Sequence, residues 1–348
     1  MSQLLPSELA FRLAAYYCSL DPASPFPCIS EMTRLNSGWE SELYTFNLQD
    51  DLAAVSAPQT LVLRLYGGGF AADKAVKEFR SLRLLRDSGY PVPDVMQVEP
   101  DSAWLGSPFM IMEYIPGPTL WSAISGSSPT QAAVLLDQFC QLFARLHALD
   151  WRPFSDEQTP RIETNPFAVI DGWLTDARQA VQAKGWTDFL PALEWLAQRR
   201  ERLACLRLSV LHHDFHHDNI LLRPDGSAVV IDWTGSHVSD LRLDLAWTLL
   251  LSYAYEGQPL RDLTLQIYQK HSAIPVEAIE VFEVMACLRR LYDVSTSLKQ
   301  GAAQAGLHPG AQQAIRGDLS AHRRVYELLV TRTGIRIPAV EAIFASYP

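Results

Sequence analysis

The most informative part of this 348-residue sequence is the run Leu211-His212-His213-Asp214-Phe215-His216-His217-Asp218-Asn219-Ile220-Leu221-Leu222, with Ile231-Asp232-Trp233 shortly after it. Two short apolar segments, Ser209–Leu211 and Ala228–Ile231, flank the polar residues and are typical of β-strands. Between them, Pro224-Asp225-Gly226 is a turn signal. The pattern predicts a polar loop followed by a hairpin, where ionisable side chains gather densely enough to carry chemistry.

The spacing of Asp214, Asn219 and Asp232 is that of a phosphoryl-transfer site. In such a site, His-x-Asp is followed by Asn five residues after the Asp, and by a second Asp at the end of a short apolar strand. A loop that leaves a strand can project Asp214 toward an acceptor hydroxyl, where it would orient the hydroxyl or accept its proton. Asn219 and Asp232 supply hard oxygen ligands, so we expect them to hold Mg²⁺ between nucleotide phosphates.

A metal hydrolase is an alternative interpretation of this cluster. The residues that would then bind zinc or a metal pair are His212, His216, Asp214 and Asp232. No helical His-Glu-x-x-His pattern accompanies them, so phosphoryl transfer is the favoured interpretation. His212 fits a residue that anchors the loop by packing and hydrogen bonding better than it fits a catalytic group.

Strand-like runs and two helices characterise the first third of the chain. A leading helix is predicted over Pro6–Leu20, with Ser7 as its N-cap. Strands are predicted at 42–48, 60–66, 95–100 and 109–113, and a helix at 73–85. Beyond a turn-rich stretch at 114–118 the chain is mainly helical, with apolar stripes within 136–149, 187–204, 242–255, 276–299 and 310–332.

Taken together, these motifs resemble those of the aminoglycoside phosphotransferase and choline kinase-like family, small-molecule relatives of the protein kinases. The family's His-Gly-Asp-(Leu/Phe)-His-x-x-Asn, Ile-Asp-Trp and Asp-Leu-Ala correspond here to 212–219, 231–233 and Asp244-Leu245-Ala246. The resemblance extends over roughly residues 29–300 and implies an α+β, bilobal protein-kinase-like fold, with a small β-rich N-lobe and a large, mainly helical C-lobe. The implied division is an N-terminal helical extension (1–28), a nucleotide-binding N-lobe (29–112), a hinge (113–117) and a helical C-lobe with the catalytic loop and acceptor site (118–348).

The resemblance also implies how the N-lobe and the hinge bind ATP or GTP. Ser37 and Gly38 lie where the family keeps the loop that covers the nucleotide. Arg64 is expected to contact the α- and β-phosphates, held there by an ion pair with Glu78 on the following helix.

At the hinge, the backbone C=O of Glu113 and the backbone N–H of Ile115 would contact the adenine edge. In the C-lobe, the resemblance implies that Asp244 is a buried carboxylate that accepts hydrogen bonds from the backbone of the catalytic loop. His212 and Asp244 are therefore expected to support that loop.

Four positions depart from the family pattern. Arg64 stands where protein kinases use Lys, and His213 and Asp218 stand where the family commonly has Gly. Asp240-Leu241 replaces a frequent Asp-Pro. Arg64 and Asp218 keep a nucleotide-binding pseudokinase or regulatory module open as an alternative, although Asp214, Asn219 and Asp232 are intact.

Composition restricts the class of partner. Lys and Arg number 29 against 39 Asp and Glu, a net charge of −10, which argues against binding duplex nucleic acid through bulk positive charge. The same balance favours a cationic acceptor, such as an aminoglycoside, or else a macrolide or an amino alcohol. Candidate acidic residues for an acceptor pocket are Asp240, Asp262, Glu280, Glu283 and Asp293.

Compartment and membrane signals are weak. Five dispersed cysteines without a Cys-x-x-Cys pair suggest a reducing compartment and no structural zinc. We see neither a secretory leader nor an apolar stretch long enough to cross a membrane, so the cytoplasm is expected. The sequence makes no prediction of the oligomeric state.

Overall fold

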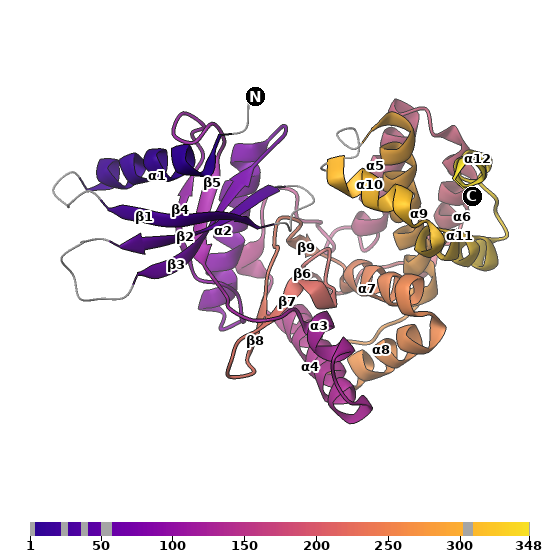
Figure 1. Cartoon of the computed structure of the whole chain (residues 1–348). Helices are drawn as coiled ribbons and strands as arrows, with labels where there is room; N and C mark the ends of the chain where they lie inside the picture. The colour runs from indigo at the N-terminus through magenta and orange to yellow at the C-terminus, as the bar shows by residue number, and fades with distance from the viewer. Residues whose placement is uncertain (1–3, 22–26, 36–40, 50–57, 302–308, 348) are drawn as a thin grey trace. The chain divides into compact units, whose positions relative to one another are not determined.

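The computed structural model describes residues 4–21, 27–35, 41–49, 58–301 and 309–347, without the side chains of 309–311 and 314. The chain forms two compact units (Figure 1). The first unit comprises Met1–Pro118 and Leu221–Thr234, and the second comprises Thr119–Ile220 and Gly235–Pro348. The first unit is thus discontinuous in sequence, because residues 221–234 belong with it rather than with the helical part of the chain.

A five-stranded antiparallel sheet forms the centre of the first unit, in the order β1-β2-β3-β5-β4 (Figure 1). Its strands and those of a second, two-stranded sheet are β1 (Cys28–Leu35), β2 (Ser41–Gln49), β3 (Gln59–Tyr66), β4 (Val95–Glu99), β5 (Phe109–Glu113), β7 (Ile220–Leu222) and β8 (Ala228–Val230). The helices are α1 (Pro6–Leu20) and α2 (Ala71–Asp87). All four strands and both helices predicted in this region are present.

The leading helix α1 packs into the core of this unit instead of standing apart as an extension. Leu9, Leu13 and Tyr16 are buried in one apolar cluster with residues of the central strands. The ring of Tyr16 meets that of Phe109 edge to face, with centroids 5.0 Å apart. The predicted cap is wrong, because Leu5 occupies the N-cap position and no side chain caps the helix.

Helices make up most of the second unit. They are α3 (Leu120–Ser125), α4 (Pro129–Ala148), η1 (Arg152–Phe154), α5 (Ala168–Ala183), η2 (Thr187–Phe189), α6 (Leu190–Ala197), η3 (Arg200–Arg202), η4 (His217–Asn219), α7 (Leu241–Glu256), α8 (Gln258–His271), α9 (Ile279–Gln300), α10 (Pro309–Gly317), α11 (Ser320–Thr333) and α12 (Pro338–Ser346). Two strands, β6 (Ser209–Leu211) and β9 (His237–Ser239), pair antiparallel. The predicted contrast between a β-rich part and a mainly helical part is confirmed.

The helix boundaries differ from expectation at two places. The stripe within 310–332 is two helices, α10 and α11, which are separated at Asp318 and Leu319. Asp318 accepts a hydrogen bond there from the backbone N of Ser320 (2.8 Å). The stripe within 187–204 contains one short α-helix, α6, between two 3₁₀ turns. Helices α3, α5, α8 and α12 were not predicted.

Trp233 explains why residues 221–234 belong to the first unit. Its side chain is fully buried, and its ring meets that of Tyr90 edge to face, with centroids 5.7 Å apart. Two backbone hydrogen bonds add to this, from Val230 N to Pro91 O (2.9 Å) and from Leu222 N to Pro118 O (3.0 Å). These long-range contacts hold the hairpin against Tyr90 and Pro91, which follow α2, and against Pro118, which follows the predicted hinge.

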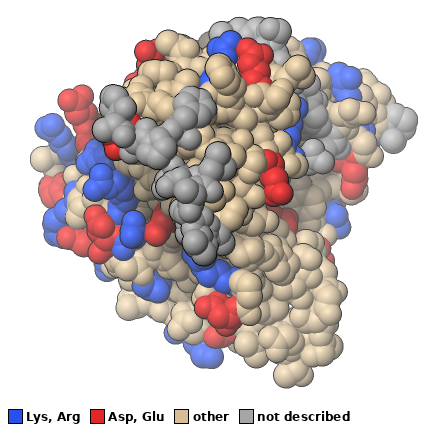
Figure 2. All heavy atoms as spheres, turned by 60° about the vertical axis from the view of Figure 1, so that its left-hand side comes forward, with Lys and Arg blue, Asp and Glu red and all other residues tan. Residues whose placement is uncertain are grey.

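The surface charge and the length of the helices bear on possible partners. On the face in Figure 2, Lys and Arg residues are interspersed with Asp and Glu residues. Within the described parts of the chain, no helix combines the length and apolar character that a membrane crossing requires. The expectations of no nucleic-acid partner and of a cytoplasmic location stay predictions.

A substitution at Gly117 tests the packing of this residue against β7. Its φ is +139°, and an added Cβ would lie 1.9 Å from the backbone oxygen of Leu222. We expect Gly117→Ala to lower the free energy of unfolding by roughly 1–3 kcal/mol, because the strain falls on backbone atoms that cannot move aside. Chemical denaturation measures the change.

Gly69→Ala is the matched control, since no atom lies within 4 Å of an added Cβ there and no positive φ is required. A Gly117→Ala protein as stable as Gly69→Ala would contradict the close approach of Gly117 to β7.

Candidate active site

Arg64 is the centre of a buried ionic cluster in the first unit. It lies on β3 with its side chain almost completely buried. Its Nη1 donates to Glu78 Oε1 on α2 (3.0 Å), so the expected ion pair is present. Its Nη2 donates to Asp232 Oδ1 (2.8 Å) and to Thr234 Oγ1 (2.7 Å). Sequence reasoning proposed Asp232 as a metal ligand and missed this second carboxylate contact.

The environment of Glu78 suits a permanent ion pair. Its Oε2 accepts from the hydroxyl of Tyr66 (2.6 Å), and its Oε1 also accepts from the backbone N of Trp233 (3.2 Å). Burial raises the pKa of Glu78, and the charge of Arg64 opposes this rise. Burial alone would lower the pKa of Arg64, but Glu78 and Asp232 outweigh it and raise that pKa, so the guanidinium is charged.

At the predicted hinge, Glu113 ends β5 and is held by its neighbours. Its Oε1 accepts from Arg223 Nη1 (2.7 Å), and its backbone N donates to Asp94 O (2.8 Å). The side chain of Ile115 is buried. Ser37 and Gly38, the predicted nucleotide-covering residues, lie outside the described residues.

In the second unit, Asp244 on α7 holds the backbone of the loop that follows β6. It is fully buried and accepts from the backbone N of His212 (2.7 Å) and of His213 (2.9 Å), the contact that the resemblance implies. His147 Nε2 lies 3.3 Å from the same carboxylate, and its Nδ1 is paired with the hydroxyl of Tyr268 (2.7 Å). Sequence reasoning missed this contact.

The electrostatics of Asp244 follow from these partners. Burial alone would raise its pKa, but the hydrogen bonds and charges of His147 and the loop outweigh burial and lower the pKa. Asp244 is therefore a carboxylate with a full set of donors, which fixes the positions of the residues that precede Asp214.

Every polar part of Asp214 has a partner in the second unit. Its Oδ1 accepts from Trp247 Nε1 (2.7 Å), and its Oδ2 lies 3.5 Å from His216 Nε2. Its backbone N donates to His212 Nδ1 (3.3 Å), which matches the anchoring role expected for His212. Its backbone O accepts from Asn219 Nδ2 (2.9 Å). Burial would raise the pKa of Asp214, but His216 and Trp247 outweigh this and lower it, so the carboxylate is ionised.

The backbone explains one departure from the family pattern. His213 has φ +73°, in the left-handed region that glycine adopts without strain. Its ring lies against that of His237, with centroids 4.9 Å apart. Asp232 is also left-handed, with φ +65°. A non-glycine residue in this left-handed conformation lowers the stability of the folded protein by about 1–3 kcal/mol, and such residues are concentrated at functional sites.

The other two loop departures have structural partners. Asp218 Oδ1 accepts from the hydroxyl of Thr119 (3.0 Å). Asp240 is the N-cap of α7, where its carboxylate accepts from the backbone N of Arg242 (2.9 Å) and pairs with the side chain of the same residue (2.6 Å).

Most of the acidic residues considered for a cationic acceptor are paired with arginine. Besides Asp240, Glu283 is buried between Arg261 and Arg332, with contacts of 2.7 and 2.8 Å. Asp262 also pairs with Arg261 (2.8 Å), and Glu280 pairs with Arg202 (2.8 Å). Their charges are offset within the second unit, so they give little support to a cationic acceptor.

The predicted site residues therefore form two groups. Arg64, Glu78 and Asp232 meet in the first unit. Asp214 meets Asn219 in the second unit. Because Asp232 belongs to the first unit, its convergence with Asp214 and Asn219 on one metal ion stays a prediction. Across the described residues, no group of three or more His, Cys, Asp or Glu forms a metal site.

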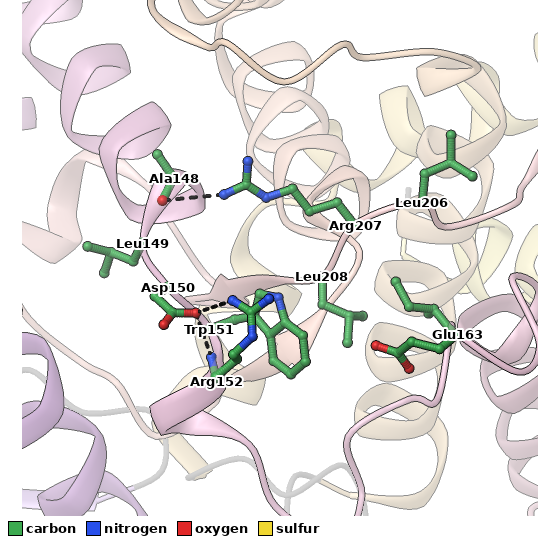
Figure 3. Close-up of a pocket in the computed structure, with 10 residues that line it drawn as sticks. Ala148, Leu149, Asp150, Trp151, Arg152, Glu163, Leu206, Arg207 and Leu208 are labelled. Carbon is green, nitrogen blue, oxygen red and sulfur yellow. Dashed lines mark hydrogen bonds and ion pairs between the residues drawn. The ribbon is translucent and has the colours of Figure 1, made fainter.

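A separate hollow of about 440 Å³ lies at the start of β6 (Figure 3). Its walls are residues 148–152, 162–163 and 206–208, and none of the predicted site residues is among them. The charged residues in it are partly paired, since Asp150 contacts Arg152 (2.9 Å) and Arg207 reaches the carbonyl of Ala148 (3.4 Å).

Solved structures share the fold of the chain. A putative aminoglycoside phosphotransferase from Ralstonia eutropha JMP134 aligns with a TM-score of 0.64 at 18% identity, over 92% of this chain and 98% of that one. Choline kinase LicA from Streptococcus pneumoniae aligns with a TM-score of 0.56 at 14% identity, over 92% and 98%. A ternary complex of aminoglycoside phosphotransferase APH(4)-Ia with ADP and hygromycin B gives 0.57 at 15%, over 93% and 99%. The predicted protein-kinase-like fold class is confirmed.

Curated relatives match at the level of sequence. Acyl-CoA dehydrogenase family member 10 of Mus musculus is 27% identical over 269 residues, which cover 74% of this chain and 24% of the relative. Member 11 of Homo sapiens is 26% identical over 237 residues, which cover 62% and 28%. The chain thus spans about a quarter of the length of these relatives. The model of the phosphotransferase enzyme family (APH) matches residues 31–278, well over half of the sequence, and the chain belongs to that family.

Proposed function

We propose that this chain is a small-molecule kinase, which transfers the γ-phosphoryl group of ATP or GTP to a hydroxyl of a small acceptor. The observation that carries the proposal is the ionised carboxylate of Asp214, held at both oxygens on a loop whose backbone is fixed by Asp244. A carboxylate held in this way can orient an acceptor hydroxyl for in-line attack, or accept its proton, without first reorganising. Asp214 is the proposed catalytic residue.

Asn219 and Asp232 fit the ligands of a hard divalent cation. The amide nitrogen of Asn219 donates to Asp214 O, which directs its Oδ1 away from that bond. The carboxylate of Asp232 accepts from Arg64 at Oδ1, so the guanidinium offsets only part of its negative charge. We propose that these two residues hold Mg²⁺, which when bound would offset the negative charge of the nucleotide phosphates.

The first unit would supply the nucleotide contacts. Arg64 is proposed to contact the phosphates while Glu78 keeps it oriented, and the backbone of Glu113 and Ile115 to contact the base. The glycine-bearing segment with Ser37 and Gly38 is proposed to cover the phosphates. Support comes from the related structures, one of which is a complex with ADP and hygromycin B, and another of which is a choline kinase.

The first prediction from the proposed function concerns Asp214. We expect Asp214→Asn to lower kcat by at least about 100-fold, because the amide neither accepts a proton nor orients the hydroxyl as a carboxylate does. The measurement is Mg²⁺-dependent release of ADP or GDP with a panel of aminoglycosides, macrolides and amino alcohols. Asp225→Asn, in the exposed turn between β7 and β8, is the control and should stay within about twofold of wild type.

Equal rates for wild type and Asp214→Asn on an acceptor that wild type phosphorylates would remove Asp214 from the mechanism. Activity that needs no nucleotide, together with stoichiometric zinc in the purified protein, would instead favour the hydrolase.

The second prediction concerns Asp232. A ligand at 100 times its dissociation constant stabilises a protein by about 2.7 kcal/mol, so Mg·ATP should raise the melting temperature of wild type. We expect Asp232→Asn to lose the Mg²⁺-dependent part of this rise. Differential scanning fluorimetry with ATP in Mg²⁺ and in EDTA measures it, with Asp225→Asn again as control.

Full Mg²⁺-dependent protection of Asp232→Asn would exclude Asp232 as a ligand. Protection of wild type without transfer to any acceptor would favour the pseudokinase or regulatory module.

The third prediction separates support from chemistry. In Asp244→Asn, the new NH₂ group would face a backbone N–H or His147, so two donors would oppose each other in a buried position. We expect the free energy of unfolding to fall by roughly 3 kcal/mol and kcat to fall with it. Asp214→Asn should lose kcat while its denaturation midpoint changes far less, and similar stability of the two variants would contradict the assigned role of Asp244.

A further inference from the structure

One face of α7 contacts the catalytic loop at three successive points. Asp244 accepts from the loop backbone, and Thr248 Oγ1 donates to the backbone O of Phe215 (2.7 Å). Trp247 Nε1 donates to Asp214 Oδ1 (2.7 Å). Residues three and four positions apart on a helix share a face, which explains how one short sequence reaches all three points. Of these three residues, Trp247 is the one that contacts the side chain of Asp214.

Trp247 is itself held rigidly. Its side chain is buried, and the guanidinium of Arg289 lies 4.0 Å from its ring centroid, in the geometry of a cation–π contact. Arg289 Nη1 in turn donates to the backbone O of His213 (3.0 Å), so α9 holds both the indole and the loop. An indole N–H is a hydrogen-bond donor only, so in this contact Trp247 donates and Asp214 accepts.

His216 completes the arrangement at the other oxygen of Asp214. Its Nδ1 accepts from the backbone N of Asp218 (3.2 Å), which leaves Nε2 to carry the proton that faces Asp214 Oδ2 at 3.5 Å. Each oxygen of Asp214 therefore faces one donor, and the plane of the carboxylate is fixed. The Trp247 contact is the shorter of the two and comes from outside the loop.

We propose that Trp247 is a positioning residue for phosphoryl transfer, whose indole N–H fixes the rotamer of Asp214 so that its remaining lone pairs meet the acceptor hydroxyl. This inference rests on the proposed function. A carboxylate oxygen accepts more than one hydrogen bond, so the bond from Trp247 leaves room for the hydroxyl. In a loose phosphoryl-transfer transition state, orientation contributes more than basicity, so a carboxylate held by donors is suited to the task.

The test is Trp247→Phe, which keeps an aromatic ring beneath Arg289 and removes the N–H. We expect kcat to fall about 10- to 100-fold, with the KM for nucleotide nearly unchanged. Trp186→Phe is the matched control, because Trp186 is an equally buried tryptophan of the second unit whose Nε1 donates to Thr296 Oγ1 (3.1 Å), remote from Asp214 in sequence and contacts. It removes the same group and should leave kcat within about twofold of wild type.

A second measurement leaves Trp247 intact. Protein labelled with ¹⁵N-tryptophan has nine indole N–H signals, and Asp214→Ala should shift the signal that is missing from Trp247→Phe, since it removes the acceptor. Should Trp247→Phe fail to fold, the Asp214→Ala spectrum alone decides, because a set of unmoved signals overturns the contact.

The two proposals fail in different ways. Wild type that transfers phosphate to no acceptor overturns the proposed function. Active wild type with an unchanged kcat in Trp247→Phe overturns the role of Trp247 alone, as does an equal loss of kcat in Trp186→Phe.

Discussion

The candidate active site depends on a buried negative charge at Asp244. Moving a carboxylate out of water costs several kcal/mol, and at Asp244 two backbone N–H groups and His147 offset that cost. Because the charge is stable only with those donors in place, the loop before Asp214 has one conformation that satisfies it. The strained backbone of His213 persists for the same reason, since leaving it would break a hydrogen bond to a buried ion.

The first unit also contains buried charges, here a pair of opposite sign. Arg64 and Glu78 are both buried and paired with each other. Each has further hydrogen-bond partners, which are Asp232 and Thr234 for Arg64, and Tyr66 for Glu78. Removing one partner of such a pair leaves an uncompensated buried charge. The resulting loss of stability is larger than the stability that the intact pair contributes. In both units, then, buried ions fix the positions of the side chains to which we assign chemistry.

Local spacing was enough to predict some of this arrangement and not the rest. The His-x-Asp spacing with its downstream Asn led to Asp214 and Asn219, which are in contact five residues apart. The likeness of Asp-Leu-Ala to a family motif led to Asp244, whose hydrogen bond to His212 crosses 32 residues of sequence. Period-2 and period-3.6 patterns located four of the five strands of the sheet, all except β1, and α2. Trp247 and His147 were missed as partners because a tryptophan or histidine on an apolar helix face is usually core, and only the tertiary structure brings them to Asp214 and Asp244. The attachment of residues 221–234 to the first unit depends on Trp233 fitting beside Tyr90, which no local pattern encodes.

The discontinuity of the first unit has a consequence for how the chain is made. A ribosome adds about 5–20 residues per second, and domains generally fold as they emerge. The sheet and α2 are complete once Pro118 has been synthesised, but Glu78 and Arg64 then lack Trp233, Asp232 and Thr234, which come more than 100 residues later. For several seconds or longer the nascent unit must hold two buried ionic groups with part of their hydrogen-bonding shell missing, so it reaches its final stability only after much of the helical unit has also been translated.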